Sequence, residues 1–309
     1  MNQDVIRLEQ VIRCLSPKIK IPIEKNKLLL APKLREIRLR INRPVCLDCG
    51  DQCYYLTTGG SLTPFISDSL LCASKDEIEE TVQSVCDYSV YSHQHELLNG
   101  FVTLRGGHRA GVCGTAVYHG DSLDNIRDIG SVCLRLSREF PGCADTIFRR
   151  YNGGGLLLCG EPCSGKTTLL RDLARQLSYQ YRVALIDERG ELAAVLNGEP
   201  QNDVGLCDIF TGYYKSSAMR HALRSMSPEI VVCDEIGSPD DAAAFAECQR
   251  SGVNVIATAH AGSAEELLRR RDLRRILRTG ALETLVFLSD RQHVGQIRAV
   301  RKAGELLAS

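Results

Sequence analysis

Short apolar runs alternate with helix-like segments through the second half of the chain. Five of these runs read as buried strands: 156–159, 183–186, 230–233, 253–258 and 285–288. The segments 167–177 and 240–250, which lie between them, have the spacing of apolar residues typical of helices. Buried strands that alternate with helices indicate a mostly parallel sheet covered on both faces. We therefore expect residues 146–309 to form an α/β domain.

The first 145 residues show a different pattern. Residues 1–30 read as a helix followed by a connector. In 36–41 every second residue is apolar and arginines stand between them, which predicts a strand. Ser74 and Glu77 have the spacing of a capping box at a helix start. The glycines within 105–114 predict tight turns and a close backbone approach between strands. We expect residues 1–145 to form a smaller α+β domain.

Composition and charge narrow the function classes. A chain of 309 residues exceeds one typical core, which agrees with two domains. Lys+Arg and Asp+Glu both number 38, so no overall field favours nucleic acid or a membrane surface. The start of the chain lacks the apolar segment of a signal peptide, and no run approaches the roughly 20 apolar residues of a membrane span. We expect a soluble, intracellular protein.

The 14 cysteines are scattered along the chain, and buried free thiols are their simplest interpretation in such a protein. Cys46, Cys49 and Cys53 form one cluster, and the first two have metal-like spacing. No fourth ligand is evident, so a metal site there remains the less favoured of two interpretations.

Residues 160–167 match the P-loop pattern G-x-x-x-x-G-K-[ST], with an expected strand before them and a helix after them. Such a loop turns backbone N–H groups toward phosphate oxygens, and the helix N-terminus adds positive partial charge. Lys166 would reach the β- and γ-phosphates of ATP, and the Thr167 hydroxyl would bind Mg²⁺. The residues expected at the nucleotide are Gly160, Glu161, Pro162, Cys163, Ser164, Gly165, Lys166, Thr167 and Thr168.

Three other strands end in polar residues that would face the same edge of a parallel sheet. Asp234 would hold Mg²⁺, and Glu235 would orient or deprotonate the attacking water. Glu188 could help to position that water, or could be a solvated loop carboxylate. His260 could sense the γ-phosphate, or could be a structural histidine.

These four elements, in this order, resemble the secretion ATPases of type II and type IV systems, which are hexameric RecA-like P-loop motors. The sequences at 36–40, 43–44, 107–114, 187–191, 223–228 and 234–237 more specifically resemble the stage III AA sporulation family of endospore-forming bacteria. The resemblance covers nearly the whole chain. It implies a cytoplasmic ATPase in the mother cell, peripheral at the membrane that faces the forespore. Its partners would be membrane proteins of the same sporulation operon, which build a channel toward the forespore.

The resemblance also implies that arginines from a neighbouring subunit reach ATP. Arg109, Arg135 and Arg138 could do this, and Arg224 precedes the second acidic strand where secretion ATPases also carry an arginine. Each of these residues could equally form an ordinary salt bridge. Two features depart from the secretion ATPases. The acidic strand that ends in Gly-Glu in those ATPases ends in Asp-Glu here, at 234–235, so both Glu188 and Glu235 remain candidates for the base. The cysteine–zinc module of some secretion ATPases is not recognisable.

Two other functions compete with a secretion motor. Six arginines within 267–278 could bind nucleic-acid or lipid phosphates in a nucleic-acid-dependent RecA-like ATPase. No aromatic residues stand between them for base stacking, so a solvated helix face or subunit interface is favoured and no nucleic-acid partner is expected. A nucleotide-dependent scaffold with little turnover is the third possibility, and the paired carboxylates argue against it.

Overall fold

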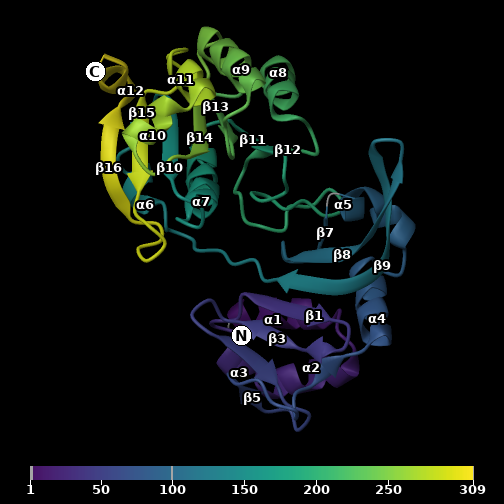
Figure 1. Cartoon of the computed structure of the whole chain (residues 1–309). Helices are drawn as coiled ribbons and strands as arrows, with labels where there is room; N and C mark the ends of the chain where they lie inside the picture. Colours follow the sequence, from purple (N-terminus) through teal and green to yellow (C-terminus); the bar gives the residue numbers. More distant parts are fainter. Residues whose placement is uncertain (1–2, 99, 309) are drawn as a thin grey trace. The chain divides into compact units, whose positions relative to one another are not determined.

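The structure, a computed structural model, describes residues 3–98 and 100–308. It divides into two compact units, coloured along the chain in Figure 1. Unit 1 comprises Met1–Arg138 and the loop Leu196–Gln201, and unit 2 comprises Glu139–Val195 and Asn202–Ser309. The loop is a feature that the sequence did not predict, because it belongs to unit 1 although the residues on both sides of it belong to unit 2.

Unit 2 contains a seven-stranded sheet in the order β12-β11-β13-β14-β10-β15-β16. Its strands are β10 (Leu156–Gly160), β11 (Val183–Asp187), β12 (Asp208–Thr211), β13 (Ile230–Cys233), β14 (Asn254–His260), β15 (Thr284–Leu288) and β16 (Ile297–Lys302). All neighbours pair in parallel except β15 and β16, which are antiparallel. The five strands expected from the apolar runs are all present, and the prediction of a mostly parallel sheet is confirmed.

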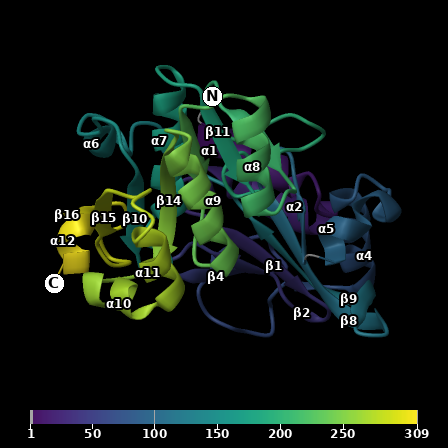
Figure 2. The same ribbon diagram turned by 90° about the horizontal axis from the view of Figure 1, so that it is seen from above.

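Helices cover both faces of this sheet, as the continuous apolar strands require. They are α6 (Asp145–Phe148), α7 (Lys166–Ser178), α8 (Lys215–Ser225), α9 (Pro239–Arg250), α10 (Ala264–Arg269), α11 (Arg271–Leu277) and α12 (Ala303–Ala308). Alternate residues of β10 enter different cores: Leu156 and Leu158 pack with residues of α7, whereas Leu157 and Cys159 share a core with residues of α8, α9 and α11. Helices α8 and α9 lie side by side (Figure 2).

The carboxyl ends of the central strands meet at one edge of the sheet, which positions the candidate site. Gly160 at the end of β10 is in register with His260 at the end of β14. Cys233, which precedes the acidic pair, is in register with Ala257 of the same β14 and with Ile186 of β11. Four expected polar strand ends thereby come together across long separations in sequence.

Unit 1 contains a second seven-stranded sheet, antiparallel throughout, in the order β5-β4-β3-β1-β9-β8-β7. Its strands are β1 (Glu36–Arg40), β3 (Cys46–Asp48), β4 (Cys53–Leu56), β5 (Leu62–Thr63), β7 (Phe101–Thr103), β8 (Arg109–His119) and β9 (Ser122–Arg135), and β2 (Arg43–Pro44) pairs separately with β6 (Cys72–Ala73). The helices are α1 (Gln3–Ile12), α2 (Pro17–Lys25), α3 (Lys27–Leu30), α4 (Lys75–Val85), the 3-10 helix Val90–His93 and α5 (Gln94–Leu98).

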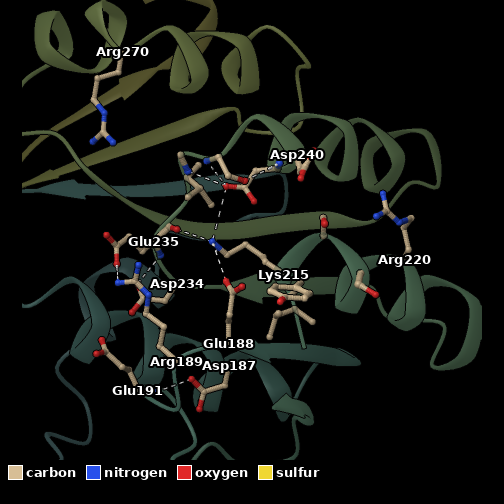
Figure 3. Close-up of a pocket in the computed structure, with 18 residues that line it drawn as sticks. Asp187, Glu188, Arg189, Glu191, Lys215, Arg220, Asp234, Glu235, Asp240 and Arg270 are labelled. Carbon is tan, nitrogen blue, oxygen red and sulfur yellow. Dashed lines mark hydrogen bonds and ion pairs between the residues drawn. The ribbon is translucent and has the colours of Figure 1, made fainter. Parts of the chain in front are cut away.

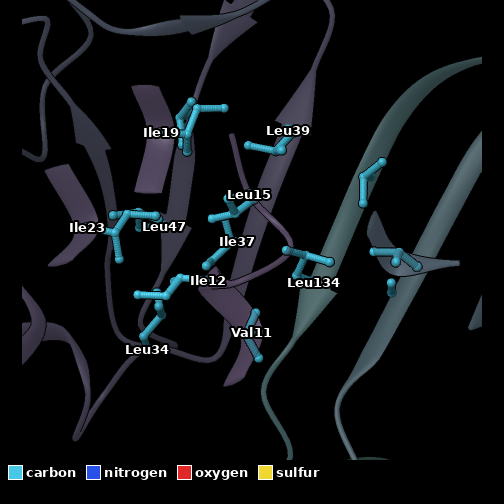
Figure 4. Packing of buried hydrophobic residues seen from close by; sticks show 14 of the residues in the cluster. Val11, Ile12, Leu15, Ile19, Ile23, Leu34, Ile37, Leu39, Leu47 and Leu134 are labelled. Carbon is cyan, nitrogen blue, oxygen red and sulfur yellow. The ribbon is translucent and has the colours of Figure 1, made fainter. Parts of the chain in front are cut away.

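The N-terminal segment forms three helices rather than the single helix and connector expected from the sequence. A new helix begins after Ser16, because Pro17 is well suited to the first helical position. Figure 4 shows Ile12 of α1 and Ile19 of α2 packed in the core of unit 1, among side chains that include Ile37 of β1. This core gives unit 1 its own hydrophobic interior.

Two local predictions for unit 1 are confirmed. The side chain of Ser74 accepts from the backbone N–H of Glu77, and the Glu77 carboxylate accepts from the N–H of Ser74, as in a capping box. At Gly114 in β8 a Cβ atom would lie 2.5 Å from the carbonyl oxygen of Arg127 in β9. Only glycine allows these two strands to approach so closely there.

Within residues 3–98 and 100–308 no helix has both the length and the apolar character needed to cross a bilayer. The same residues contain no group of three or more His, Cys, Asp or Glu side chains arranged to hold a metal ion. Cys46 and Cys49 are buried, and Cys53 is exposed on β4. Burial raises the pKa of the Cys46 thiol to about 11, so this side chain is a neutral thiol at pH 7.

Candidate nucleotide site

The loop between β10 and α7 has the backbone conformation of an anion-binding turn. Cys163 and Gly165 have positive φ angles of 65° and 92°, which turn the chain sharply before α7 begins at Lys166. The N-cap Gly165 has no side chain to cap the helix. The N–H groups of the first turn have no intrahelical acceptor, so this helix start is suited to phosphate oxygens. Glu161, Pro162 and Cys163 form the exposed tip of the loop.

Close packing fixes the base of this loop. A Cβ atom on Gly160 would lie 2.4 Å from the hydroxyl oxygen of Ser164, so glycine leaves room for the Ser164 side chain in its present orientation. The Ser164 hydroxyl is itself buried without a hydrogen-bond partner among the described residues. The backbone N–H of Gly295, in the β15–β16 loop, donates to the carbonyl of Ser164 at 2.9 Å. The base of the loop is thus fixed by packing and by the bond from Gly295, and the Ser164 hydroxyl is left to bond a ligand.

Lys166 is folded against the loop that it follows. Its ammonium donates to the carbonyls of Gly160 at 3.0 Å and Glu161 at 2.8 Å, and lies 3.1 Å from Nδ1 of His260. Burial lowers the pKa of Lys166, and the carboxylates of Asp234 and Glu235 oppose this shift. A phosphate bound in the loop would form an ion pair with Lys166 and would stabilise its charged form.

His260 connects Lys166 to Glu235. An ammonium can only donate, so Nδ1 of His260 must accept from Lys166. Burial and the charge of Lys166 both lower the pKa of His260, which keeps the ring neutral at pH 7. The ring proton therefore resides on Nε2, which lies 3.4 Å from Oε1 of Glu235. His260 therefore lies between the P-loop lysine and one of the two candidate bases, and its role toward the γ-phosphate stays a prediction.

Thr167 and Asp234 meet at the centre of the site. The Thr167 hydroxyl donates to Oδ2 of Asp234 at 2.7 Å, although 67 positions separate them in sequence. The other oxygen of Asp234 accepts from the hydroxyl of the fully buried Thr258 and from the N–H of Glu235. A hydroxyl beside a carboxylate is the oxygen donor set that Mg²⁺ prefers, so these residues fit the ion that the P-loop fold implies.

Glu188 and Glu235 line a polar cavity of about 790 Å³ that Figure 3 shows at the ends of β11 and β13. Glu235 forms an ion pair with Arg189. Glu188 lies 4.0 Å from the ammonium of Lys215, which also donates to the backbone carbonyl of Glu235 at 2.6 Å. Among the described residues, the carboxylate of Glu235 lies beside His260, whereas that of Glu188 lies beside Lys215.

Asp187 precedes Glu188 but has a different role. Its side chain is buried, and its two oxygens accept from the N–H groups of four consecutive residues, 191–194, at 2.7 to 3.1 Å. It therefore fixes the turn that follows β11, and Glu188 stands at the start of that turn.

The four candidate arginines differ in how they are held. Arg109 stacks over the ring of Phe101 at 4.3 Å, and Arg135 lies 3.2 Å from the Glu36 carboxylate. Arg138 donates to Asp4 at 2.7 Å and also to the carbonyls of Ala31 and Leu34, so it anchors the N-terminal helices of unit 1. Arg224 is exposed in the last turn of α8.

Three residues that contact the site were not predicted from the sequence. Thr258 donates to Asp234, Arg189 pairs with Glu235, and Lys215 lies beside Glu188. One signal pointed to Lys215. It is the first residue of α8, where the helix dipole disfavours a positive charge, so a lysine there calls for a specific partner.

Comparison with known proteins identifies the family. The family described as "Sporulation stage III, protein AA" matches residues 5–306. The stage III sporulation protein AA of Bacillus subtilis (strain 168) is 34% identical over 287 residues, which cover 89% of each chain. The chain belongs to this family. The family resemblance seen in the sequence is thereby confirmed, and the matched residues include the P-loop, the acidic strand ends and most of unit 1.

Two solved structures share the fold of this chain. The pilus retraction motor PilT, solved with bound ADP, has a TM-score of 0.56 and 18% identity, with 91% of this chain and 81% of that chain covered. The ATPase DotB of Legionella pneumophila has a TM-score of 0.53 and 16% identity, with 86% and 76% covered. At these identities the likeness shows a shared fold, which confirms the predicted P-loop architecture.

Proposed function

We propose that this member of the sporulation family is a Mg²⁺-dependent ATPase. The observation that carries the proposal is the contact between Thr167 and Asp234 beside an uncapped helix N-terminus. It brings together a phosphate-binding loop, a pair of oxygen ligands for Mg²⁺ and, one residue later, the carboxylate of Glu235. Phosphoryl transfer to water requires these three components within one site.

The residues divide the work as follows. Lys166 exchanges its loop carbonyls for the β- and γ-phosphates and neutralises charge that builds during transfer. Thr167 and Asp234 hold Mg²⁺, which supplies charge neutralisation at the phosphates. Glu235 takes a proton from the attacking water as the new O–P bond forms and the bond to ADP breaks. Glu188 is the less favoured base, because its carboxylate lies beside the ammonium of Lys215, whereas that of Glu235 lies beside His260, which contacts the P-loop lysine.

The nucleoside part of ATP would lie on the other flank of α7. A cavity of about 660 Å³ is lined there by Ile147, Arg150, Leu169 and residues 295–300. Leu169, which lines this cavity, follows the threonines of the first turn of α7. The cavity also borders the β15–β16 loop, whose Gly295 donates to the carbonyl of Ser164. Its lining combines aliphatic side chains, such as Ile147 and Leu169, with the polar side chains of Arg150, Gln296 and Arg298, which would suit the face and edge of a purine base.

An ATPase assay on the full chain tests the proposal. Lys166→Ala should abolish turnover, because it removes several kcal/mol of transition-state stabilisation. Glu235→Gln should bind ATP normally but hydrolyse it slowly, and Asp234→Asn should weaken Mg²⁺-nucleotide binding. Lys302→Ala and Glu305→Gln, both exposed and in unit 2, are matched controls. Normal hydrolysis by Lys166→Ala would refute the site, and a fast Glu235→Gln with an inactive Glu188→Gln would transfer the base role to Glu188.

We further propose that the hydrolysis drives a secretion-like, membrane-associated complex during endospore formation. The family supports the sporulation part, and the fold shared with PilT and DotB supports a motor. The protein would act from the mother-cell cytoplasm at the membrane that faces the forespore, bound to membrane proteins of its operon. Cross-linking in sporulating cells would test this location: recovery of those membrane proteins supports it, and their consistent absence argues against it.

A ring, most simply a hexamer, would complete the site with an arginine of a neighbouring subunit. Mixing inactive Lys166→Ala with inactive Arg109→Ala tests this. Some mixed sites would combine an intact lysine with an intact neighbouring arginine, and activity should partly return. The same test applies to Arg135, Arg138 and Arg224, although Arg138 would first have to release its bonds within unit 1. A lack of recovery in confirmed mixed assemblies would exclude the arginine tested.

A nucleic-acid-dependent ATPase remains the second candidate, because all six arginines within 269–278 are exposed, on α10, on α11 or at the ends of these helices. DNA or RNA would then stimulate hydrolysis with a steep salt dependence. We expect no stimulation, since the buried leucines of these helices already explain them as a solvated cover of the sheet.

A further inference from the structure

Lys215 joins three elements at the edge of the site. Its side chain is 9% exposed, and its ammonium donates to the carbonyl of Glu235 at 2.6 Å. The same ammonium lies 4.0 Å from carboxylate oxygens of both Glu188 and Asp241. Figure 3 shows it between the turn after β13, the end of β11 and the start of α9. A buried lysine at a helix start is costly unless such acceptors compensate it.

The turn that Lys215 contacts has an unusual backbone. Glu235 has φ +46°, in the left-handed region that non-glycine residues seldom adopt. Its N–H donates to the hydroxyl of Thr258 at 2.8 Å, and its carbonyl accepts from Lys215. The buried carboxylate of Asp241 accepts from the N–H groups of residues 237 and 238, at 2.9 Å each. A conformation that costs about 1–3 kcal/mol persists only where its surroundings fix it in this way.

This backbone sets the direction of the Glu235 side chain. With φ at +46°, the carboxylate reaches Nε2 of His260 at 3.4 Å and Arg189. Without the bond to its carbonyl, Glu235 could relax toward the right-handed region, which would swing the carboxylate away from these partners. By donating to the backbone carbonyl of Glu235, Lys215 therefore helps to fix the direction of the proposed base.

We propose that Lys215 is a positioning residue for Glu235, acting through the backbone rather than on ATP. The inference rests on the proposed ATPase function and deepens it. Lys215 touches neither the P-loop nor the Thr167–Asp234 pair in any recorded contact among the described residues. Its loss should slow the chemical step and leave nucleotide affinity nearly intact.

Kinetics of the full chain separate this role from a structural one. Lys215→Met should lower kcat by roughly 10- to 100-fold, as expected for a displaced general base, with the affinity for Mg²⁺-ADP changed less than about 3-fold. Lys215→Arg, which keeps a cationic donor, should recover part of the rate. Lys302→Met removes an exposed lysine of unit 2 and is the matched control. Unchanged kcat in Lys215→Met, or equal losses of rate and affinity, would overturn the proposal.

Double variants identify the residue through which Lys215 acts. In a Glu235→Gln background, Lys215→Met should cause no further loss of rate, because the group being positioned is already removed. If instead Glu188→Gln abolishes the effect of Lys215→Met, the lysine acts by neutralising Glu188 and the proposal is wrong. Additive losses in the Glu235→Gln background would also overturn it.

Hydrogen–deuterium exchange tests the same inference without turnover. In nucleotide-free protein, the amides of 235–238 should exchange faster in Lys215→Met than in wild type, whereas those of α7 should be unchanged. This result would uphold the positioning role even if wild type proved unable to hydrolyse ATP, which would refute only the proposed function. Unchanged exchange at 235–238 would refute the positioning role. If Lys215→Met does not fold, Lys215→Gln replaces it in every measurement.

Discussion

Replacing Asp187 by asparagine should destabilise unit 2 strongly. The two oxygens of Asp187 accept four backbone N–H groups, those of Glu191 and Leu192 on one oxygen and of Ala193 and Ala194 on the other. Asparagine keeps one acceptor oxygen and presents an NH₂ group to the other two donors. Two buried N–H groups then lose their acceptor, and the other two lose a charged partner.

The magnitude follows from these four bonds. A hydrogen bond to a charged group contributes about 1.5–3 kcal/mol, and a buried donor left without a partner costs about 1–3 kcal/mol. Two lost bonds therefore predict a decrease of roughly 3–5 kcal/mol in the free energy of unfolding, with local relaxation offsetting part of the larger sum. For a unit of this size the melting temperature should fall by on the order of 10 °C.

Urea and thermal unfolding, followed by circular dichroism, measure the effect, and amide exchange at 191–194 localises it. Asp208→Asn, which removes an exposed carboxylate from β12 of the same sheet, is the control and should change stability by less than about 0.5 kcal/mol. A decrease below about 1 kcal/mol for Asp187→Asn, or unchanged exchange at 191–194, would show that the carboxylate does not hold this turn.

Three further predictions concern other parts of the molecule. Thr258→Val removes the hydroxyl that donates to Asp234, and should weaken Mg²⁺-ADP binding by roughly 10-fold in titrations; unchanged affinity would contradict the assignment. Gly155→Ala would place a Cβ atom 1.7 Å from the carbonyl of Ala281, and should cost on the order of 3 kcal/mol in urea unfolding. Burial, helped by Arg7, lowers the pKa of His108 to about 4, so stability that is complete above pH 6.5 should fall by about 3 kcal/mol as the pH decreases to 4, and His108→Gln should flatten this dependence.

The core of unit 2 could be predicted from the sequence because its strands carry their own signal. A strand buried on both faces, such as β13, is apolar without interruption. In a parallel sheet the polar residues that follow such strands all lie at the same edge. The P-loop is equally local, since eight consecutive residues contain its glycines, lysine and threonine. The five strands predicted from their own apolar residues are present for this reason, whereas the helix boundaries in residues 1–30 carried no comparable signal and were predicted wrongly.

Contacts between distant segments were not predictable in the same way. Lys215 and Glu235 are 20 positions apart, and their contact depends on where α8 begins relative to the end of β13. The pairing of Thr258 with Asp234 depends on the register of two neighbouring strands. The apolar run 253–258 was visible in the sequence, but the partner of Thr258 is set by backbone geometry that no local pattern encodes.

The loop 196–201 changes how the two units can be separated. The chain passes between the units at 138–139, again at 195–196 and again at 201–202, so three covalent connections join them. One proteolytic cut near residue 139 would leave both halves tethered, and a truncated protein that starts after Asn152 would carry a loop deprived of its Gln201–Gly106 bond. Ala194, the last residue anchored by Asp187, lies two positions before the second connection. The turn fixed by Asp187 and the loop that belongs to unit 1 are therefore direct neighbours along the backbone.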